Sequence, residues 1–241
     1  MIINAYKTPI FRVGHSLSDF LFRHLPRLHE GSIVVVTSKI VALAEGRVAV
    51  CATERARIRF IKNESQWAMK TKFTWLTIKD GTVMASAGID QSNADGACVL
   101  LPKDCYRSAA ILRTQLMQQF KVRRLGVLIT DSRTAPLREG IVGMTLGYAG
   151  FHGLREYRGT PDIFGRPLRM TKTNVADSLA AAAVLLMGEG AERQPLAVIT
   201  RAPVVFARRV RRKELQIALQ EDMYRPLFEN MKSIRGKNLT T

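Results

Sequence analysis

The alternation of apolar and polar positions predicts strands and helices that mix along the whole chain. Residues 32–38 form a β-branched run typical of a buried strand, and residues 124–131 form a second apolar strand that ends at Asp131. Residues 105–120 carry apolar side chains at helical spacing, and residues 175–187 predict a helix with Gly188 beyond its end. The elements lack the regular spacing of βαβ units. The pattern therefore favours an α+β fold over a doubly wound α/β fold.

Two short signals mark boundaries between elements. Ser16 or Ser18 is a candidate N-cap of a helix that ends near Pro26. Asp80 and Gly81 form a favoured turn dipeptide between two stretches of strand character, so we expect a β-hairpin there.

The arrangement of these elements predicts two interlocked parts. We expect a discontinuous domain with a mixed sheet, built from residues 1–80 and 173–241, because the strand-rich start and the last helix and strand suggest one core. Residues 81–172 are then an inserted second α+β domain whose loops, rich in glycine, proline and arginine, carry the metal site.

The composition indicates a large apolar core and shows an excess of positive charge. The chain has 241 residues, 46% of them apolar, and its 37 Lys and Arg against 20 Asp and Glu give a net charge of +17. Such a charge attracts nucleic acid, anionic membranes and phosphorylated metabolites. The low aromatic content of 7% argues against a dedicated nucleic-acid module. The densest basic cluster, residues 208–213, is predicted to lie outside the catalytic site and to raise the local concentration of an anionic substrate.

Neither a membrane segment nor a cysteine framework is expected. No run approaches the 18 to 20 apolar residues of a membrane span, and the N-terminal residues lack the apolar stretch of a secretory signal. We therefore expect a cytoplasmic protein. Cys51, Cys98 and Cys105 are scattered without the spacing of metal ligands, so we expect buried apolar residues rather than disulfides or a zinc site.

The first candidate site is a polar loop at residues 88–96. Asp90, Ser92, Asn93 and Asp95 bring carboxylate, hydroxyl and amide oxygens together. Hard ions such as Mg²⁺ and Mn²⁺ prefer these ligands and usually take further oxygens from substrate phosphates. The same residue types also build an ordinary turn, and the loop alone does not separate the two interpretations.

The second candidate site follows the two apolar strands. Asp131, at the end of its strand, is a rigidly held ligand position that could combine with Asp90, although helix capping by Asp131 or Ser132 is the alternative. Ser38 and Lys39 follow the other strand and offer a hydroxyl and an ammonium group to a phosphate at a helix start. The glycine-lysine pattern of a P-loop is absent.

Taken in order, several segments resemble the coenzyme F420-0:L-glutamate ligase family, the gamma-glutamyl ligases that extend the tail of coenzyme F420. The similarity covers most of the chain from about residue 10 to residue 201. The segments that carry it are EGSIVVVTSKIVALAEGR, AGIDQSN, LLPKDCYRSAAILR, ITDS with REG, LGYAGFHGLREYRGTPDIFGRPLRMTKTNVADSLAAAAVLLMGEG and PLAVITR.

The resemblance implies a GTP-dependent reaction in a homodimer. A carboxylate of the acceptor is phosphorylated to an acyl phosphate, which the amine of L-glutamate attacks to form an amide; ATP in place of GTP stays open. Phosphoryl transfer needs metal ions and cations against the phosphate charge, so Mg²⁺ or Mn²⁺ is expected. By resemblance, the catalytic carboxylates and metal ligands are Asp90 and Asp131, with Ser132 as a further metal ligand. The nucleotide contacts are Ser38, Lys39, Asn93, Arg138 and Arg201.

The chain departs from the family pattern at four positions. Leu43 stands where the family usually has a lysine, Thr134 and Ala135 where it has a Gly-Arg pair, and Ala202 where it has a glycine. The metal centre is kept while part of the phosphate or substrate contact set is changed. The anionic acceptor is accordingly F420-0 or a folate-like molecule, and a non-catalytic binder of polyanions, including nucleic acid, on the same fold is the alternative from another class.

Overall fold

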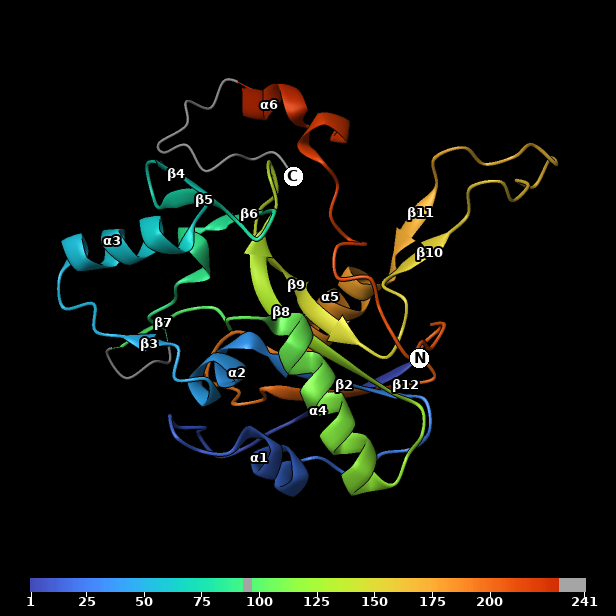
Figure 1. Ribbon diagram of the computed structural model, residues 1–241, viewed down its shortest axis with the longest axis horizontal. Coiled ribbons are helices and arrows are strands. Elements are labelled where there is room, and N and C mark those ends of the chain that lie inside the picture. Colours follow the sequence, from blue (N-terminus) through green and yellow to red (C-terminus); the bar gives the residue numbers. More distant parts are fainter. Residues whose placement is uncertain (93–96, 230–241) are drawn as a thin grey trace. The chain divides into compact units, whose positions relative to one another are not determined.

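The computed structural model describes residues 1–92 and 97–229, and Figure 1 shows its helices and strands. The chain divides into two compact units. The first unit consists of Met1–Glu45 and Pro102–Leu215, and the second unit consists of Gly46–Leu101 and the segment from Gln216 onward. Helices combine with a sheet of mixed strand direction in the first unit, which confirms the α+β class.

A five-stranded sheet forms the centre of the first unit. Its strand order is β1-β12-β2-β8-β9. The strands β2 and β8 run parallel, whereas every other neighbouring pair in this sheet is antiparallel. The strands are β1 (Ile2–Tyr6), β12 (Leu196–Thr200), β2 (Ser32–Thr37), β8 (Leu125–Thr134) and β9 (Ile141–Ala149).

Helices cover both faces of this sheet, which explains the continuous apolar run of β2. Val34 and Val36 pack into a cluster with α1, α2 and α4. Ile33 and Val35 point to the other face and pack against α5. The helices are α1 (Leu17–His24), α2 (Ser38–Ala44), α4 (Cys105–Phe120) and α5 (Val175–Met187).

Short polar side chains cap α1, α4 and α5, and the cap predicted at Ser16 is confirmed. The hydroxyl of Ser16 accepts a hydrogen bond from the backbone N–H of Asp19 at the start of α1. Asp104 caps α4, and Asn174 caps α5, which ends before Gly188.

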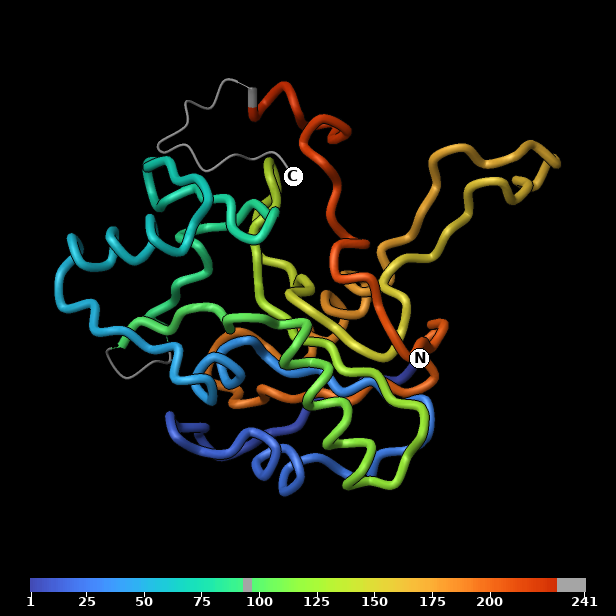
Figure 2. Tube along the Cα trace, in the orientation of Figure 1, coloured from blue at the N-terminus to red at the C-terminus, as the bar shows by residue number. Residues whose placement is uncertain are grey.

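A two-stranded arm also belongs to the first unit. Its strands β10 (Leu154–Glu156) and β11 (Lys172–Asn174) pair antiparallel, and Figure 2 shows the arm extending away from the sheet. The loop between the strands exposes three large apolar side chains, those of Ile163, Phe164 and Met170.

The second unit is built from shorter elements around a small core. The strands β4, β5 and β6 form an antiparallel sheet, and β3 pairs with β7. Ile61, Ile89 and Leu100 are the buried aliphatic side chains of its apolar cluster. The elements are β3 (Val48–Ala49), α3 (Glu54–Glu64), β4 (Trp67–Lys70), β5 (Trp75–Lys79), β6 (Thr82–Ala85), the 3₁₀ turns Ser86–Gly88 and Leu219–Glu221, β7 (Cys98–Val99) and α6 (Arg225–Glu229).

The turn between β5 and β6 confirms the hairpin expected at Asp80 and Gly81. Both residues have positive φ, 51° and 70°. Lys79 and Thr82 are paired directly beside them. A two-residue turn with positive φ at both positions has the twist that joins antiparallel strands well, and glycine accepts it without steric cost.

A partly buried ion-pair group lies in the second unit. The carboxylate of Glu64 accepts hydrogen bonds from Lys79 Nζ at 2.6 Å and from an Arg47 guanidinium nitrogen at 2.7 Å. Burial raises the pKa of Glu64, but the hydrogen bonds and charges of Lys79 and Arg47 outweigh it, so the pKa lies below its ordinary value.

The unit boundaries differ from those predicted at residues 80 and 172. The segment expected to be an inserted domain, residues 81–172, contains β8 and β9, which belong to the same sheet as β1 and β2. The reason is the parallel pairing of β8 with β2, from Ser32 opposite Leu125 to Thr37 opposite Thr130. Local sequence patterns carry no information about such a pairing.

Cys51 and Cys98 are buried as expected, but the expectation that they form no disulfide is wrong, and Cys105 is only half-buried. Cys51 and Cys98 form a disulfide, with Cα atoms 5.9 Å apart. The pairing of Ala49 with Cys98 in β3 and β7 brings the neighbouring Cys51 close, although the two cysteines lie 47 positions apart in the chain. Cys105 is not part of a disulfide.

Within the described part of the chain, no helix has both the length and the apolar character needed to cross a bilayer.

Candidate functional site

Two of the predicted site residues meet where the parallel strands β2 and β8 run side by side. Thr37 is paired with Thr130, and Ser38 and Asp131 follow these two residues directly. The Ser38 hydroxyl donates a hydrogen bond to Asp131 Oδ1 at 3.4 Å. Ligands of sheets with helices on both faces commonly bind at the carboxyl ends of parallel strands, where loops and helix starts come together. This edge of the first unit is therefore the candidate site.

The strand that carries Asp131 differs from the predicted one. The strand β8 does not end at Asp131 but continues to Thr134, because β9 pairs with it along the extension. The pairing of the two strands shifts register between Ile129 and Thr130, which is a β-bulge. Bulges change the direction of the side chains that follow them and are frequent beside active sites. Asp131 is thus held on a rigid strand, half-buried, immediately after the irregularity.

A glutamate that sequence reasoning missed completes this edge. The Ser132 hydroxyl donates a short hydrogen bond to the carboxylate of Glu189. Glu189 lies in the loop between α5 and β12, which is anchored where Thr37 N–H donates to the carbonyl of Pro195 at 3.0 Å. An acidic residue between Gly188 and Gly190, directly after a helix, is the signal that would have pointed to it.

Asp131 and Ser132 face opposite sides of β8, because successive side chains of a strand alternate between faces. Asp131 contacts Ser38, the first residue of α2, on one face. Ser132 contacts Glu189, which follows α5, on the other face. The end of the strand pair thus carries one carboxylate on each face, each with a hydroxyl beside it.

These oxygens fit a hard divalent cation. Carboxylates and hydroxyls are ligands that Mg²⁺ and Mn²⁺ accept, and Mg²⁺ commonly binds through one or two carboxylates plus substrate phosphates. Among residues 1–92 and 97–229, no three His, Cys, Asp or Glu side chains gather into a metal cage. The site therefore suits an ion that shares its coordination with a bound phosphate.

Lys39 lies next to Ser38 in α2 and is half-buried. The residue lies directly after the end of β2, and its contact with a phosphate stays a prediction. Arg138 lies in the exposed loop that joins β8 to β9, at the end of the sheet that also carries Asp131.

Arg201 is not gathered at this edge. It follows β12, which runs antiparallel to β2 with Leu196 opposite Val36 and Ile199 opposite Ile33. The residue after β12 therefore lies at the opposite end of the sheet from Ser38 and Asp131. The sequence could not show this, because it does not reveal the direction in which β12 pairs.

Asp90 belongs to the second unit and is held by its own loop. Its backbone exchanges two hydrogen bonds with Val99, of 3.0 and 2.8 Å. Its carboxylate accepts hydrogen bonds from the Ser92 N–H at 2.8 Å and the Ser92 hydroxyl at 2.7 Å. This geometry is that of an Asx turn, so the turn interpretation describes the local structure. A combination of Asp90 with Asp131 stays a prediction, and Asn93 lies outside the described residues.

The positions that depart from the family pattern have simple surroundings. Leu43 packs, partly buried, against the apolar cluster on the α4 face of the sheet. Ala202 packs against the α5 face. Thr134 and Ala135 are exposed where β8 ends. Leu43 therefore packs at the margin of the core and supplies no positive charge to the site.

Comparison with known proteins gives a consistent result over most of the chain. The model of the family F420-0:Gamma-glutamyl ligase matches residues 5–201, a range that includes residues of both units. The chain is 36% identical over 226 residues to the coenzyme F420:L-glutamate ligase of Methanothermobacter thermautotrophicus, covering 84% of this chain and 89% of that protein.

Two further relatives agree. The coenzyme F420:L-glutamate ligase of Archaeoglobus fulgidus is 32% identical over 210 residues, which cover 79% of this chain and 83% of that protein. The corresponding protein of Methanocaldococcus jannaschii is 30% identical over 237 residues, covering 90% of this chain and 94% of that protein.

Proposed function

Because the chain belongs to the F420-0:gamma-glutamyl ligase family, we propose that it is an amide-forming ligase that joins L-glutamate to an anionic acceptor such as coenzyme F420-0. The observation that carries the proposal is the edge of the first unit where Ser38 contacts Asp131 and Ser132 contacts Glu189. It gathers oxygen ligands at the ends of two parallel strands, where phosphate chemistry is commonly placed.

The proposed reaction runs through two substitutions. A carboxylate oxygen of the acceptor attacks the terminal phosphorus of GTP, which forms an acyl phosphate and releases GDP. The amine of L-glutamate then attacks the acyl carbon, phosphate leaves, and the amine loses a proton as the amide forms. The first step is phosphoryl transfer, in which the protein contributes mainly position and positive charge.

The residues of the first unit divide these tasks. Asp131 is the proposed carboxylate ligand of one Mg²⁺ or Mn²⁺ ion, and the Ser38 hydroxyl positions it. Ser132 and Glu189, on the other face of β8, are the proposed ligands of a second ion. A bound ion of this kind neutralises charge on the phosphate oxygens. Lys39 and Arg138 supply cations toward the nucleotide. We also propose that the carboxylate of Asp90 binds a divalent ion.

The overall charge supports an anionic pair of substrates. A protein of net charge +17 concentrates nucleoside triphosphate and a phosphodiester-containing acceptor around itself. Use of GTP also fits the cytoplasm, where we expect the protein to act.

A folate-like acceptor is the second candidate, because the family pattern of contacts is changed at Leu43. A lysine that the family pattern places at this position is replaced by a side chain that packs at the margin of the core. The residues that contact the phosphate or the acceptor therefore differ from the family pattern, whereas Asp131 and Ser132 match it.

Acceptor screening tests the proposal. The protein is incubated with isotope-labelled glutamate, Mg²⁺ or Mn²⁺, GTP or ATP, and either F420-0 or a reduced folate, and products are detected by mass. We expect a product heavier by one glutamate, together with nucleoside diphosphate release that depends on both acceptor and glutamate. Absence of such a product with every acceptor and nucleotide would favour the non-catalytic polyanion binder.

Two substitutions test the metal site. Asp131→Asn and Asp90→Asn should each abolish metal-dependent nucleotide binding while the melting temperature stays the same or rises, because a metal-binding carboxylate carries an uncompensated negative charge when no metal is bound. Asp19→Asn makes the same charge change at an exposed position of α1 and is the matched control. Unchanged affinity with a lowered melting temperature would assign the two aspartates to turns and caps.

We also propose a homodimer. The exposed apolar tip of the arm, with Ile163 at 91% and Phe164 at 79% exposure, supplies a surface that a second copy would cover. A mass from light scattering close to the 26.9 kDa of one chain would contradict it.

A further inference from the structure

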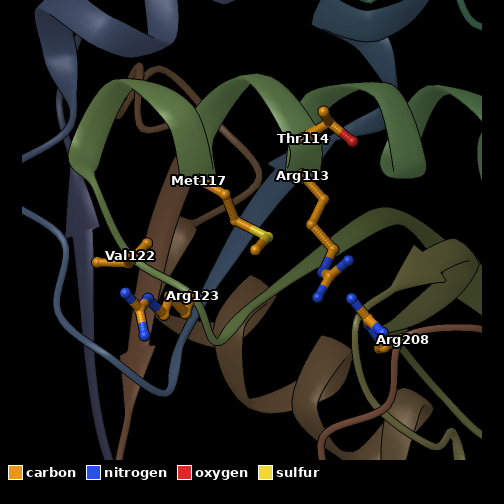
Figure 3. Close-up of a pocket in the computed structure, with 6 residues that line it drawn as sticks. All are labelled: Arg113, Thr114, Met117, Val122, Arg123 and Arg208. Carbon is orange, nitrogen blue, oxygen red and sulfur yellow. The ribbon is translucent and has the colours of Figure 1, made fainter.

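A basic cavity lies in the first unit, at the other end of β8 from Asp131. It has a volume of about 480 Å³. The second half of α4, the turn that follows α4 and the segment after β12 line it, and Figure 3 shows these side chains. The lining residues are Arg113, Thr114, Met117, Val122, Arg123 and Arg208.

Arg113 is fixed in this cavity by its surroundings. Its Nε donates a hydrogen bond to the carbonyl of Leu125 at 2.7 Å. Gly150 leaves the space in which the guanidinium lies, because a Cβ at that position would come within 2.5 Å of Arg113 Nε. The arginine side chain therefore has a defined direction although it is only half-buried.

The same glycine positions Arg208. The N–H of Ala207 donates to the carbonyl of Gly150 at 2.9 Å, and Phe206 forms a β-bridge with Phe151. The segment that carries Arg208 is thereby attached beside Arg113. Figure 3 shows the two guanidinium groups facing each other. Burial and the charge of Arg208 both lower the pKa of Arg113.

This positive charge is not balanced within the cavity. No acidic side chain lines it, and the ion pairs found in the described residues include neither Arg113 nor Arg208. Glu30 lies near, but its carboxylate accepts the backbone N–H groups of Arg123 and Arg124, at 2.6 and 2.8 Å. Two cations held face to face repel each other unless an anion lies between them.

We infer that this cavity, between Arg113 and Arg208, binds a phosphate group, either as inorganic phosphate or as part of a phosphate ester. Guanidinium groups bind phosphate oxygens through paired, charge-assisted hydrogen bonds. Met117 and Val122 give the cavity an apolar wall that the organic part of an ester would contact.

The cavity is separate from the candidate catalytic edge. Leu125, which holds Arg113, begins β8, and Asp131 follows six residues later. At about 3.3 Å per residue the two positions are about 20 Å apart along the strand. A phosphate in this cavity is therefore a second bound anion and not the one that reacts. The inference uses the first unit alone and holds whether or not the proposed reaction takes place.

Calorimetric titration of the full chain with inorganic phosphate and with phenyl phosphate tests the inference. Arg208→Gln removes one guanidinium from an exposed position, and Arg209→Gln makes the same charge change at the next residue, which is exposed and does not line the cavity. We expect saturable binding to the wild type, at least tenfold weaker binding to Arg208→Gln, and less than a twofold change in Arg209→Gln. Arg113→Gln should match Arg208→Gln, with its fold checked by circular dichroism.

The two ligands separate the two sources of phosphate. Tighter binding of phenyl phosphate assigns the cavity to a phosphate ester, and equal binding assigns it to inorganic phosphate. Equal weakening in Arg208→Gln and Arg209→Gln would show attraction by net charge alone and overturn the inference. It would also fail if the wild type showed no saturable binding at millimolar phosphate, or if Asp131→Asn removed the binding.

Discussion

The two units of this protein are stabilised in different ways. In the first unit, a five-stranded sheet is covered on both faces, and its stability is distributed over two large apolar clusters. In the second unit, five buried side chains form the apolar cluster, and two of them are the cysteines of the disulfide. Glu64, between Arg47 and Lys79, is its central polar group. Single changes should therefore disturb the second unit more than the first.

The largest expected effect comes from breaking the disulfide. The bond between Cys51 and Cys98 closes a loop of 47 residues, for which the chain-entropy estimate of stabilisation is about 4 kcal/mol. Replacing both cysteines by alanine should speed hydrogen exchange in peptides of the second unit and leave those of the first unit unchanged, as measured by mass spectrometry. Cys105→Ala, in the first unit, is the control. If hydrogen exchange became faster by the same factor in both units, the second unit would not depend on the disulfide more than the first.

Removing the carboxylate of Glu64 should have the next largest effect. Glu64→Gln leaves Lys79, with 11% of its side chain exposed, and Arg47 without their anion. Breaking a buried pair costs about 3 to 5 kcal/mol, and partial exposure reduces this to about 2 kcal/mol. Hydrogen exchange of the backbone amides in the second unit measures this loss of stability. Glu54→Gln affects an exposed 3.5 Å pair with Arg57 and should change stability by less than about 0.5 kcal/mol. Similar losses in the two variants would remove the special role of Glu64.

Acid should act on the same group with a smaller effect, because a protonated carboxyl still forms hydrogen bonds. The pKa of Glu64 is lowered in the folded protein, so the unfolded chain binds its proton more readily. This stability is complete above the ordinary glutamate pKa of 4.5 and is lost as pH falls through the folded pKa. Exchange measured between pH 6 and 3, corrected for intrinsic rates, should show the second unit loosening in the wild type and a flatter profile in Glu64→Gln. If the wild type and Glu64→Gln showed the same dependence of exchange on pH, protonation of Glu64 would not be the cause of the loosening.

The smallest effect is expected for a helix cap in the first unit. Asp104 accepts a hydrogen bond from the N–H of Arg107 at 2.9 Å at the start of α4 and forms an ion pair with Arg212. Loss of an N-cap costs about 1 kcal/mol, and an exposed ion pair adds little. Asp104→Ala should therefore lower stability by about 1 kcal/mol in chemical denaturation, with faster exchange limited to α4. A loss above about 3 kcal/mol would show that the first unit is no more tolerant than the second.

Local features of the fold followed from the sequence, because each depends on neighbouring residues. The apolar run of β2, the helical spacing of α4 and the Asp80-Gly81 turn are encoded within a few positions. The unit boundaries are not encoded in this way, since they depend on β8 pairing with β2 rather than with a strand near it in the chain.

In the candidate site, too, the sequence indicates the features that depend on neighbouring residues and not those that depend on strand pairing. Polar residues directly after apolar strands are a local signal, and this signal points to Asp131 and Ser38. The structure joins the two by a hydrogen bond, and their role in a site stays a prediction. Glu189 was missed because it reaches Ser132 only through the return of the chain after α5. Arg201 was assigned to the site although it lies at the other end of the sheet, since residue order does not show strand direction.

The position of β12 between β1 and β2 has a consequence for the synthesis of the protein. The strands β1 and β2 emerge first, but the strand that pairs with both is made about 160 residues after β2, which at 5 to 20 residues per second is roughly 8 to 32 s later. Until then, the neighbouring edges of β1 and β2 have no partner, and unpaired edges promote aggregation. The nascent chain therefore passes through a period in which its first strands need protection, and the sheet is completed only when Leu196–Thr200 leaves the ribosome.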